Sequence, residues 1–346
     1  MAGNGQAAER DYQFDNIRLL LIFFVVFGHL LESFAIESLL YRFIYSFHMP
    51  VFIFINGYFA KFDPKKTLLS LLLPYLLFQV LYFFFYAALY HNGNGFSDLQ
   101  FTTPCWLLWY LVALIAYQLI LPFISTENKA AQGAILLASV AVSLLSGCGQ
   151  GFGYFLSLSR IFAFLPFFVA GFYLRKNQKL LFSIRQEGGL CVSAASFLIP
   201  VAVFLFLHFD GAVTRNVLYA SSSYGGGYTL RMRAALSVIA FAWIFFFLRV
   251  MPRGNIPFCT VCGANTFSVY LLHGFLVRLM AKGGIFTFSP WLNVLIAALF
   301  AIAIVAAFGN KWVGRVFGFV FTFQWVEKIF AHISRAKREA YIDRVS

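Results

Sequence analysis

Apolar runs long enough to cross a membrane recur along almost the whole of this chain. A helix needs about 20 mostly apolar residues to span the hydrocarbon core of a bilayer. Ten apolar segments, some of them shorter than this, follow one another at residues 17–36, 43–60, 68–90, 105–124, 133–147, 159–174, 190–209, 233–250, 265–281 and 291–309. Of the 346 residues 61% are hydrophobic and 11% charged, a balance that soluble domains of this length do not have. The sequence therefore predicts an all-α, polytopic integral membrane protein with about ten transmembrane helices.

The basic residues predict how these helices are oriented. With ten spans both termini lie on one side, and placing them in the cytoplasm puts 19 of the 26 Lys and Arg inside and 7 outside. Because cytoplasmic loops are enriched in Lys and Arg, we expect an N-in, C-in protein of the cell (plasma or inner) membrane. The chain 1–346 is then a single membrane domain, with a polar N-terminal tail (1–16), a ten-helix bundle (17–309) and a basic cytoplasmic tail (310–346). The net charge of +13 is scattered over short loops, so we expect the bilayer as a partner and no nucleic acid.

The first apolar segment carries ionisable residues on one face. Arg18 and His29 are eleven residues apart, which is three helical turns plus about 20° and roughly 16 Å along the axis. Asp15 lies three residues before Arg18 and joins the same face. Ionisable residues inside a bilayer usually face the protein interior and mark a functional site. His29 falls about twelve residues into the predicted helix, roughly 18 Å from its cytoplasmic end, where an imidazole is a suitable general base.

Arg18 suits a different task, because a guanidinium near the cytoplasmic interface is able to bind a phosphate bidentately. One helix then offers an anion anchor at its entrance and a base deeper in the membrane, which fits a donor with an anionic head and a long reactive arm. The alternative for Arg18 and Asp15 is an interfacial ion pair. For His29 it is a hydrogen bond between helices.

Two further segments carry intramembrane histidines. The second, FHMPVFIFINGYF, places His48 in the outer half of the membrane beside the helix-breaking Pro50, and Asn56 in the inner half. For His48, substrate binding and a structural hydrogen bond are equally compatible with the sequence. The ninth, ANTFSVYLLHGFL, places Tyr270 and His273 on one face, where we expect them to support the site from behind.

A long outer loop follows the seventh segment and mixes tyrosines with arginines. Aromatic rings and fixed cations suit a carbohydrate or a phosphate-bearing ligand, but interfacial aromatics with snorkelling arginines give the same pattern. The residues concerned are Tyr219, Tyr224, Tyr228, Arg215, Arg231 and Arg233.

Five stretches in order resemble acyltransferase family 3, the multi-span membrane O-acyltransferases, and within it the fucose 4-O-acetylase-like branch. They are RDYQFDNIRLLLIFFVVFGH with its R-x10-H pair, FHMPVFIFINGYF, WYLVAL (109–114), RIFAFLPFFVAGFYL (160–174) and GANTFSVYLLHGFL (263–276). The resemblance implies a ten-helix bundle that transfers an acyl group, usually acetyl from acetyl-CoA, to a hydroxyl of a cell-envelope glycan. It implies acyl-CoA as co-substrate, a carbohydrate acceptor such as a glycan or a lipid-linked sugar, no permanently bound cofactor and no metal.

The same resemblance implies roles for individual residues. His29 either deprotonates the acceptor hydroxyl or carries the acyl group transiently, and Arg18 steadies the donor, with Asp15 beside it. Three lysines after the second segment are expected to neutralise CoA phosphates, namely Lys61, Lys65 and Lys66. Many relatives carry arginines further on, where this chain has Ser70 and Leu71, and Asn56 stands where serine is common. Candidates for stabilising the tetrahedral oxyanion are Asn56, Tyr58 or a backbone amide near Pro50.

Two other classes of function compete with the acyltransferase. One is a transporter or flippase for a glycan or a small acid, which would use the polar face of the first helix as a path. The other is a non-catalytic membrane partner in polysaccharide assembly. The R-x10-H pair inside a membrane helix and the five ordered stretches favour the enzyme.

Overall fold

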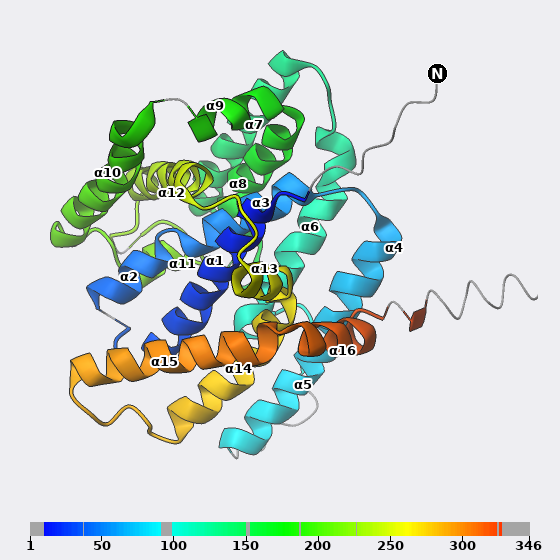
Figure 1. Ribbon diagram of the computed structural model, residues 1–346, viewed down its shortest axis with the longest axis vertical. Coiled ribbons are helices and arrows are strands. Elements are labelled where there is room, and N and C mark those ends of the chain that lie inside the picture. The colour runs from blue at the N-terminus through cyan, green and yellow to red at the C-terminus, as the bar shows by residue number, and fades with distance from the viewer. Residues whose placement is uncertain are drawn as a thin grey trace, which may run out of the picture.

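The computed structural model is built of helices packed side by side (Figure 1). It describes residues 10–36, 38–90, 99–149, 153–186, 188–225, 227–323 and 325–326, and no strand occurs among them. The α-helices are α1 (Tyr12–Leu31), α2 (Leu39–Tyr45), α3 (His48–Phe59), α4 (Pro64–Thr67), α5 (Leu73–Tyr90), α6 (Trp109–Ile124), α7 (Lys129–Leu145), α8 (Leu158–Lys176), α9 (Gln178–Gln186), α10 (Gly189–Phe209), α11 (Arg215–Tyr219), α12 (Leu230–Val250), α13 (Pro257–Ala264), α14 (Thr266–Lys282), α15 (Pro290–Gly309) and α16 (Lys311–Phe321).

The described residues confirm the predicted class of fold. Nine helical spans are long and apolar enough to cross a membrane, and a tenth is formed if α13 and α14 count as one span, bent by 75°. The second predicted segment is also broken. Its two parts, α2 and α3, meet at Phe47, whose φ of −136° lies outside the helical range, three residues before Pro50. The spans that carry His48 and His273 are therefore both interrupted.

Helix α1 lies in the middle of the bundle and packs against α3, α13, α14 and α15 (Figure 1). It begins at Tyr12, five residues before the predicted start, because Asp11 caps it and protein covers its polar first turns. The Gln13 amide donates to the carbonyls of Leu248 and Met251, and the Asn16 amide to those of Pro252 and Gly254. These partners allow two buried amides at the start of a membrane helix.

The early start of α1 changes the depth of His29 within this helix. His29 lies seventeen residues after Tyr12, or about 26 Å along the axis, in the last turn of α1. The expected position twelve residues into the helix is therefore corrected. His29 lies at the far end of the helix, close to the loops that follow α5, α7 and α10.

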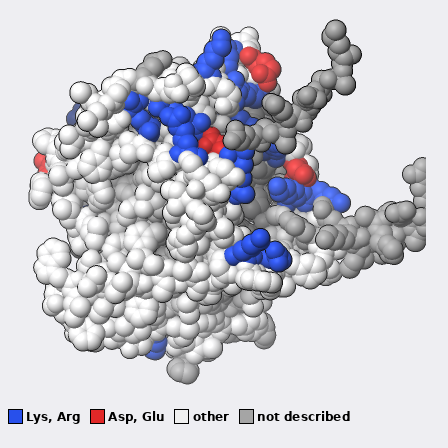
Figure 2. Space-filling view, in the orientation of Figure 1, with Lys and Arg blue, Asp and Glu red and all other residues white. Residues whose placement is uncertain are grey.

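Charged groups gather over one part of the surface. Figure 2 shows Lys and Arg over α4, α9, α16 and the start of α1, while the lower left of that view, over α15 and α2, is almost without them. The predicted tail after residue 309 begins with the helix α16, which buries Phe317 against Phe78 and Phe267. The remainder of that tail, residues 324 and 327–346, and residues 1–9 of the N-terminal tail lie outside the described residues.

Helices α3 and α8 approach so closely that glycine is required on both. A Cβ atom added at Gly57 would lie 2.0 Å from the Phe168 carbonyl oxygen, and one at Gly171 would lie 2.0 Å from that of Phe54. Backbone atoms cannot yield as a flexible side chain can, so a methyl group at either position must separate the helices.

We therefore expect Gly171→Ala to lower the melting temperature in detergent. Overpacking of this kind typically costs about 1–3 kcal/mol, which outweighs the gain of about 1 kcal/mol from replacing a helical glycine. The matched control is Gly133→Ala on α7, where an added Cβ meets no atom within 4 Å. Equal melting temperatures for the two variants would contradict the close approach of α3 and α8.

Candidate active site

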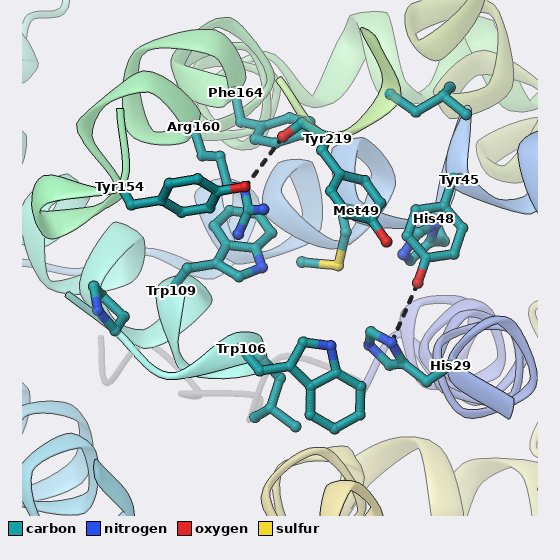
Figure 3. A pocket seen from close by; sticks show the side chains of 13 residues that line it. His29, Tyr45, His48, Met49, Trp106, Trp109, Tyr154, Arg160, Phe164 and Tyr219 are labelled. Atoms are coloured by element: carbon teal, nitrogen blue, oxygen red, sulfur yellow. Dashed lines mark hydrogen bonds between the residues drawn. The ribbon is translucent and has the colours of Figure 1, made fainter. Parts of the chain in front are cut away.

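His29 faces a cavity of about 250 Å³ at the end of α1. Figure 3 shows its ring at one side of this cavity, beside Trp106 and below Tyr45. The walls are mostly aromatic and apolar, and they consist of His29, Tyr45, His48, Met49, Pro104, Trp106, Leu107, Trp109, Tyr154, Arg160, Phe164, Leu218 and Tyr219. We call it the histidine cavity.

The imidazole of His29 is oriented through one nitrogen. Nδ1 lies 3.4 Å from a carboxylate oxygen of Glu32 and 3.2 Å from the hydroxyl of Tyr45. Because a carboxylate only accepts hydrogen bonds, Nδ1 carries the proton and the lone pair is on Nε2. Both of the ring's hydrogen bonds to described residues use Nδ1, so Nε2 is left for the cavity. This arrangement is that of a general base with an orienting carboxylate.

Glu32 is kept ionised although it is largely buried. Burial alone would raise its pKa, but the hydrogen bond to His29 and the charges of Arg278 and Arg215 lower the pKa below its usual value. A carboxylate at Glu32 stabilises the imidazolium that forms when His29 takes up a proton.

Two rings hold His29 from its other sides. His273 stacks on it with ring centroids 5.4 Å apart, and the Trp106 ring meets it edge-on at 4.6 Å. His273 is fully buried and its Nδ1 donates to the carbonyl of Val269. The guanidinium of Arg278 lies 3.9 Å from the Trp106 ring centre. The structure therefore places His273 against His29, where the sequence predicted a supporting residue.

Arg18 lines a second cavity of about 190 Å³, which we call the arginine cavity. Ile22 and Val25 continue its wall along the face of α1 that leads to His29, so the predicted polar face of this helix borders both cavities. Met49 lines both. The full wall consists of Arg18, Ile22, Val25, Met49, Phe52, Asn56, Tyr110, Leu114, Ala264, Thr266, Phe267 and Tyr270.

The ion pair between Arg18 and Asp15, which the sequence left open as the alternative to phosphate binding, is present. Asp15 is buried and accepts from Arg18 at 3.4 Å and from Arg10 at 2.7 Å. The Arg18 guanidinium also lies 4.6 Å from the ring centre of Phe59. Asp15 does not line either cavity, so it supports Arg18 from behind.

The remaining predicted residues fall into two groups, of which the first lines the cavities. His48 borders the histidine cavity and its Nδ1 donates to the carbonyl of Ile44 at 2.8 Å. Asn56 and Tyr270 border the arginine cavity. Asn56 donates to the Tyr110 hydroxyl at 2.5 Å, and the Tyr270 hydroxyl donates to the carbonyl of Leu107 at 2.5 Å.

The second group lies away from His29. Tyr58 stacks on Phe14, and its hydroxyl accepts from Gln178 at 3.2 Å, so it lines neither cavity. The three lysines are exposed around α4, namely Lys61, Lys65 and Lys66. Ser70 and Leu71, at the position of the arginines in many relatives, lie in a single π-helical turn between α4 and α5.

Strained backbone is concentrated in the loops around the histidine cavity. Positive φ angles occur at Trp106 (39°), Leu156 (46°), Ser157 (54°) and Ala220 (50°). Non-glycine residues adopt such angles rarely, and they do so mostly at functional sites. The loops also hold one another, since the Leu156 amide donates to the Thr102 carbonyl and the Ser159 hydroxyl to that of Ala220.

Five residues of the site were not among the candidates predicted from the sequence, namely Glu32, Tyr45, Met49, Trp106 and Arg160. Glu32 is three residues after His29, and the i, i+3 rule for helices would have found it. The others come from segments far apart in the chain, and no local pattern joins them. Of the outer-loop residues, Tyr219 lines the histidine cavity, while Tyr224 and Tyr228 pack on the buried Arg233.

Comparisons with known proteins bear on the whole membrane domain. The family model described as an acyltransferase domain matches residues 11–309, which include every residue that lines the two cavities. Nodulation protein NolL of Sinorhizobium fredii (strain NBRC 101917 / NGR234) is 24% identical over 308 residues, covering 79% of this chain and 80% of NolL. No solved structure gives a significant match.

Proposed function

The chain belongs to the acyltransferase family whose model spans residues 11–309, and from this premise we propose that it is a membrane O-acyltransferase. It moves an acyl group, typically acetyl, from acyl-CoA to a hydroxyl of a cell-envelope or exopolysaccharide sugar. The observation that carries the proposal is the pair of cavities along one face of α1. One is lined by His29, which Glu32 orients, the other by Arg18, and Met49 lies in the wall of both.

In this mechanism His29 acts as general base. Nε2 takes the proton of the acceptor hydroxyl while the oxygen attacks the thioester carbonyl carbon, and Glu32 stabilises the imidazolium. The tetrahedral intermediate expels the CoA sulfur, which receives the proton from His29. The products are the acyl ester of the sugar and free CoA, and His29 is again neutral.

The donor is assigned to the arginine cavity. Arg18 supplies a fixed cation for a phosphate of CoA. Phe59, whose ring lies against Arg18, is two residues before Lys61, so the exposed lysines begin close to the same end. Arg18 and His29 are roughly 16 Å apart along the helix. The pantetheine arm then extends along Ile22 and Val25 and passes Met49 to bring the thioester to His29.

The first test is CoA release by the purified protein in lipid nanodiscs with acetyl-CoA and a glycan acceptor. We expect His29→Ala to abolish release, because it removes the imidazole that Glu32 orients, whereas His208→Ala, on α10 and outside both cavities, should leave it unchanged. A melting-temperature shift on adding CoA shows that each variant is folded. Activity that persists in His29→Ala would contradict the mechanism, and substrate movement without CoA release would favour transport.

The carboxylate of Glu32 gives a second prediction. In Glu32→Gln the amide is able to donate to Nδ1, which places the proton on Nε2 and removes the base. We expect kcat to fall on the order of 10²-fold, as for the loss of general-base catalysis. Glu127→Gln is the control, because Glu127 is a surface carboxylate with an 86% exposed side chain, paired with Lys176. Equal kcat values for the two variants would rule out a role for Glu32.

Met49 gives a third prediction, since the donor arm must pass it. Met49→Trp should narrow the passage and lower transfer by about 10²-fold, the typical loss when a reacting group is misplaced by about 1 Å. Met49→Leu, of similar volume, should retain most of the rate. CoA should still shift the melting temperature of both variants. If Met49→Trp transfers as fast as the wild type, the donor does not take this route.

A further inference from the structure

Arg160 places a guanidinium in the wall of the histidine cavity. It lies near the start of α8, and its Nε donates to the carbonyl of Tyr219 at 3.2 Å. Its guanidinium carbon lies 5.0 Å from the ring centre of Trp109, 5.8 Å from that of Tyr154 and 5.6 Å from that of Tyr219. The aromatic rings and the Nε bond fix the guanidinium plane, so its two terminal nitrogens are held as a preformed pair of donors.

No carboxylate balances this charge in the cavity wall. Among the described residues that line the histidine cavity, none is Asp or Glu. The nearby carboxylate of Glu32 is hydrogen-bonded to Nδ1 of His29. Two more arginines stand around the rim, with Arg215 5.7 Å from the ring centre of Tyr219 and Arg278 against Trp106. Arginines inside membrane proteins pair with acids or with backbone carbonyls. Arg160 has a carbonyl partner at Nε, and the described cavity wall offers no acid for its terminal nitrogens.

The position of Arg160 indicates what it would bind. Figure 3 shows Arg160 across the cavity from His29, with Trp109 and Tyr219 beside it. A group that stabilises the oxyanion must be adjacent to the reacting carbon, and hence to Nε2 of His29. Arg160 is on the opposite side, where it would meet the far end of an acceptor whose hydroxyl lies at His29. A guanidinium fork is best matched by a carboxylate or a phosphate, which it binds through two parallel hydrogen bonds.

We propose that the acceptor carries an anionic group, a carboxylate or a phosphate, which Arg160 binds while the acceptor hydroxyl lies at His29. The inference rests on the proposed acyl transfer and names the class of acceptor for it. The aromatic rings of Trp109, Tyr154 and Tyr219 contact the apolar face of the sugar. A cavity of about 250 Å³ lies below the usual range of roughly 300–1,000 Å³ for drug-sized ligands, so it suits a single sugar unit with its anionic substituent.

The test compares three acceptors of similar size: methyl α-glucoside, methyl α-glucuronide and glucose 1-phosphate. The wild-type protein in nanodiscs receives acetyl-CoA and each acceptor, and mass spectrometry quantifies the acetylated product. We expect one anionic acceptor to exceed the neutral glucoside about ten- to hundredfold in kcat/KM, which is the usual range for hydrogen bonds to a charged group. The anionic sugar with the higher kcat/KM shows whether the acceptor's anionic group is a carboxylate or a phosphate.

Variants assign the preference to its residue. Arg160→Gln should remove the preference, mainly through a higher KM for the anionic acceptor. Arg160→Lys keeps the positive charge but loses the two parallel donors, so it should retain part of the preference for the anionic acceptor. This variant also tests the proposal if Arg160→Gln does not fold. The control is Arg231→Gln, which removes a positive charge from an exposed position at the start of α12 and should leave the preference intact.

The outcomes separate this inference from the proposed function. If the wild type acetylates the neutral glucoside as fast as both anionic sugars, or if Arg160→Gln keeps the full preference, the inference is wrong and acyl transfer still stands. If no acceptor is acetylated and no CoA is released, the proposed function fails and the inference fails with it.

Discussion

A polar group inside a membrane must find its partner within the protein, and the position of α1 depends on this requirement. The side-chain NH2 groups of Gln13 and Asn16 donate to backbone carbonyls at the end of α12 and in the turn before α13. These bonds tie the first turn of α1 to a segment more than 230 residues away in the chain. They also start the helix at Tyr12 and so carry His29 to its far end. Without them the helix would begin later and the imidazole would lie at a different depth.

The elements that the sequence could predict depend on local patterns. Apolar segments of spanning length, and the common face of Arg18 and His29, follow from the helical period alone, and the structure confirms both. The start of α1 could not be predicted, because Gln13 and Asn16 are polar and their partners lie far away in the chain. From the sequence alone such residues belong to a polar tail and not to a membrane helix. The second span is interrupted at Phe47 and the ninth is bent after Ala264. Hydropathy predicts neither interruption, because both segments are apolar on either side of it.

In the histidine cavity, too, some residues could be predicted from local sequence patterns and others could not. Glu32 is a local partner of His29 and was within reach of sequence reasoning. Trp106, Arg160 and Tyr219 meet because the loops after α5, before α8 and around α11 are bonded to one another and adopt strained backbone angles. Such an assembly is a property of the tertiary structure. The outer loop illustrates the limit, since its three tyrosines look alike in sequence, yet Tyr219 faces the cavity and the other two hold Arg233.

The two cavities bear on the two roles that the sequence left open for His29, those of general base and acyl carrier. His29 lines the cavity assigned to the acceptor and does not line the one assigned to the donor. A base has to remain beside the acceptor hydroxyl throughout the reaction, and its imidazolium needs a fixed negative charge, which Glu32 provides. An acyl carrier would become a neutral acyl-imidazole after losing its proton, so a paired carboxylate would help it less. On the proposed function, the placement of His29 and its pairing with Glu32 therefore favour direct transfer from thioester to hydroxyl. In that reaction the thioester reaches His29 past Met49, which lines both cavities.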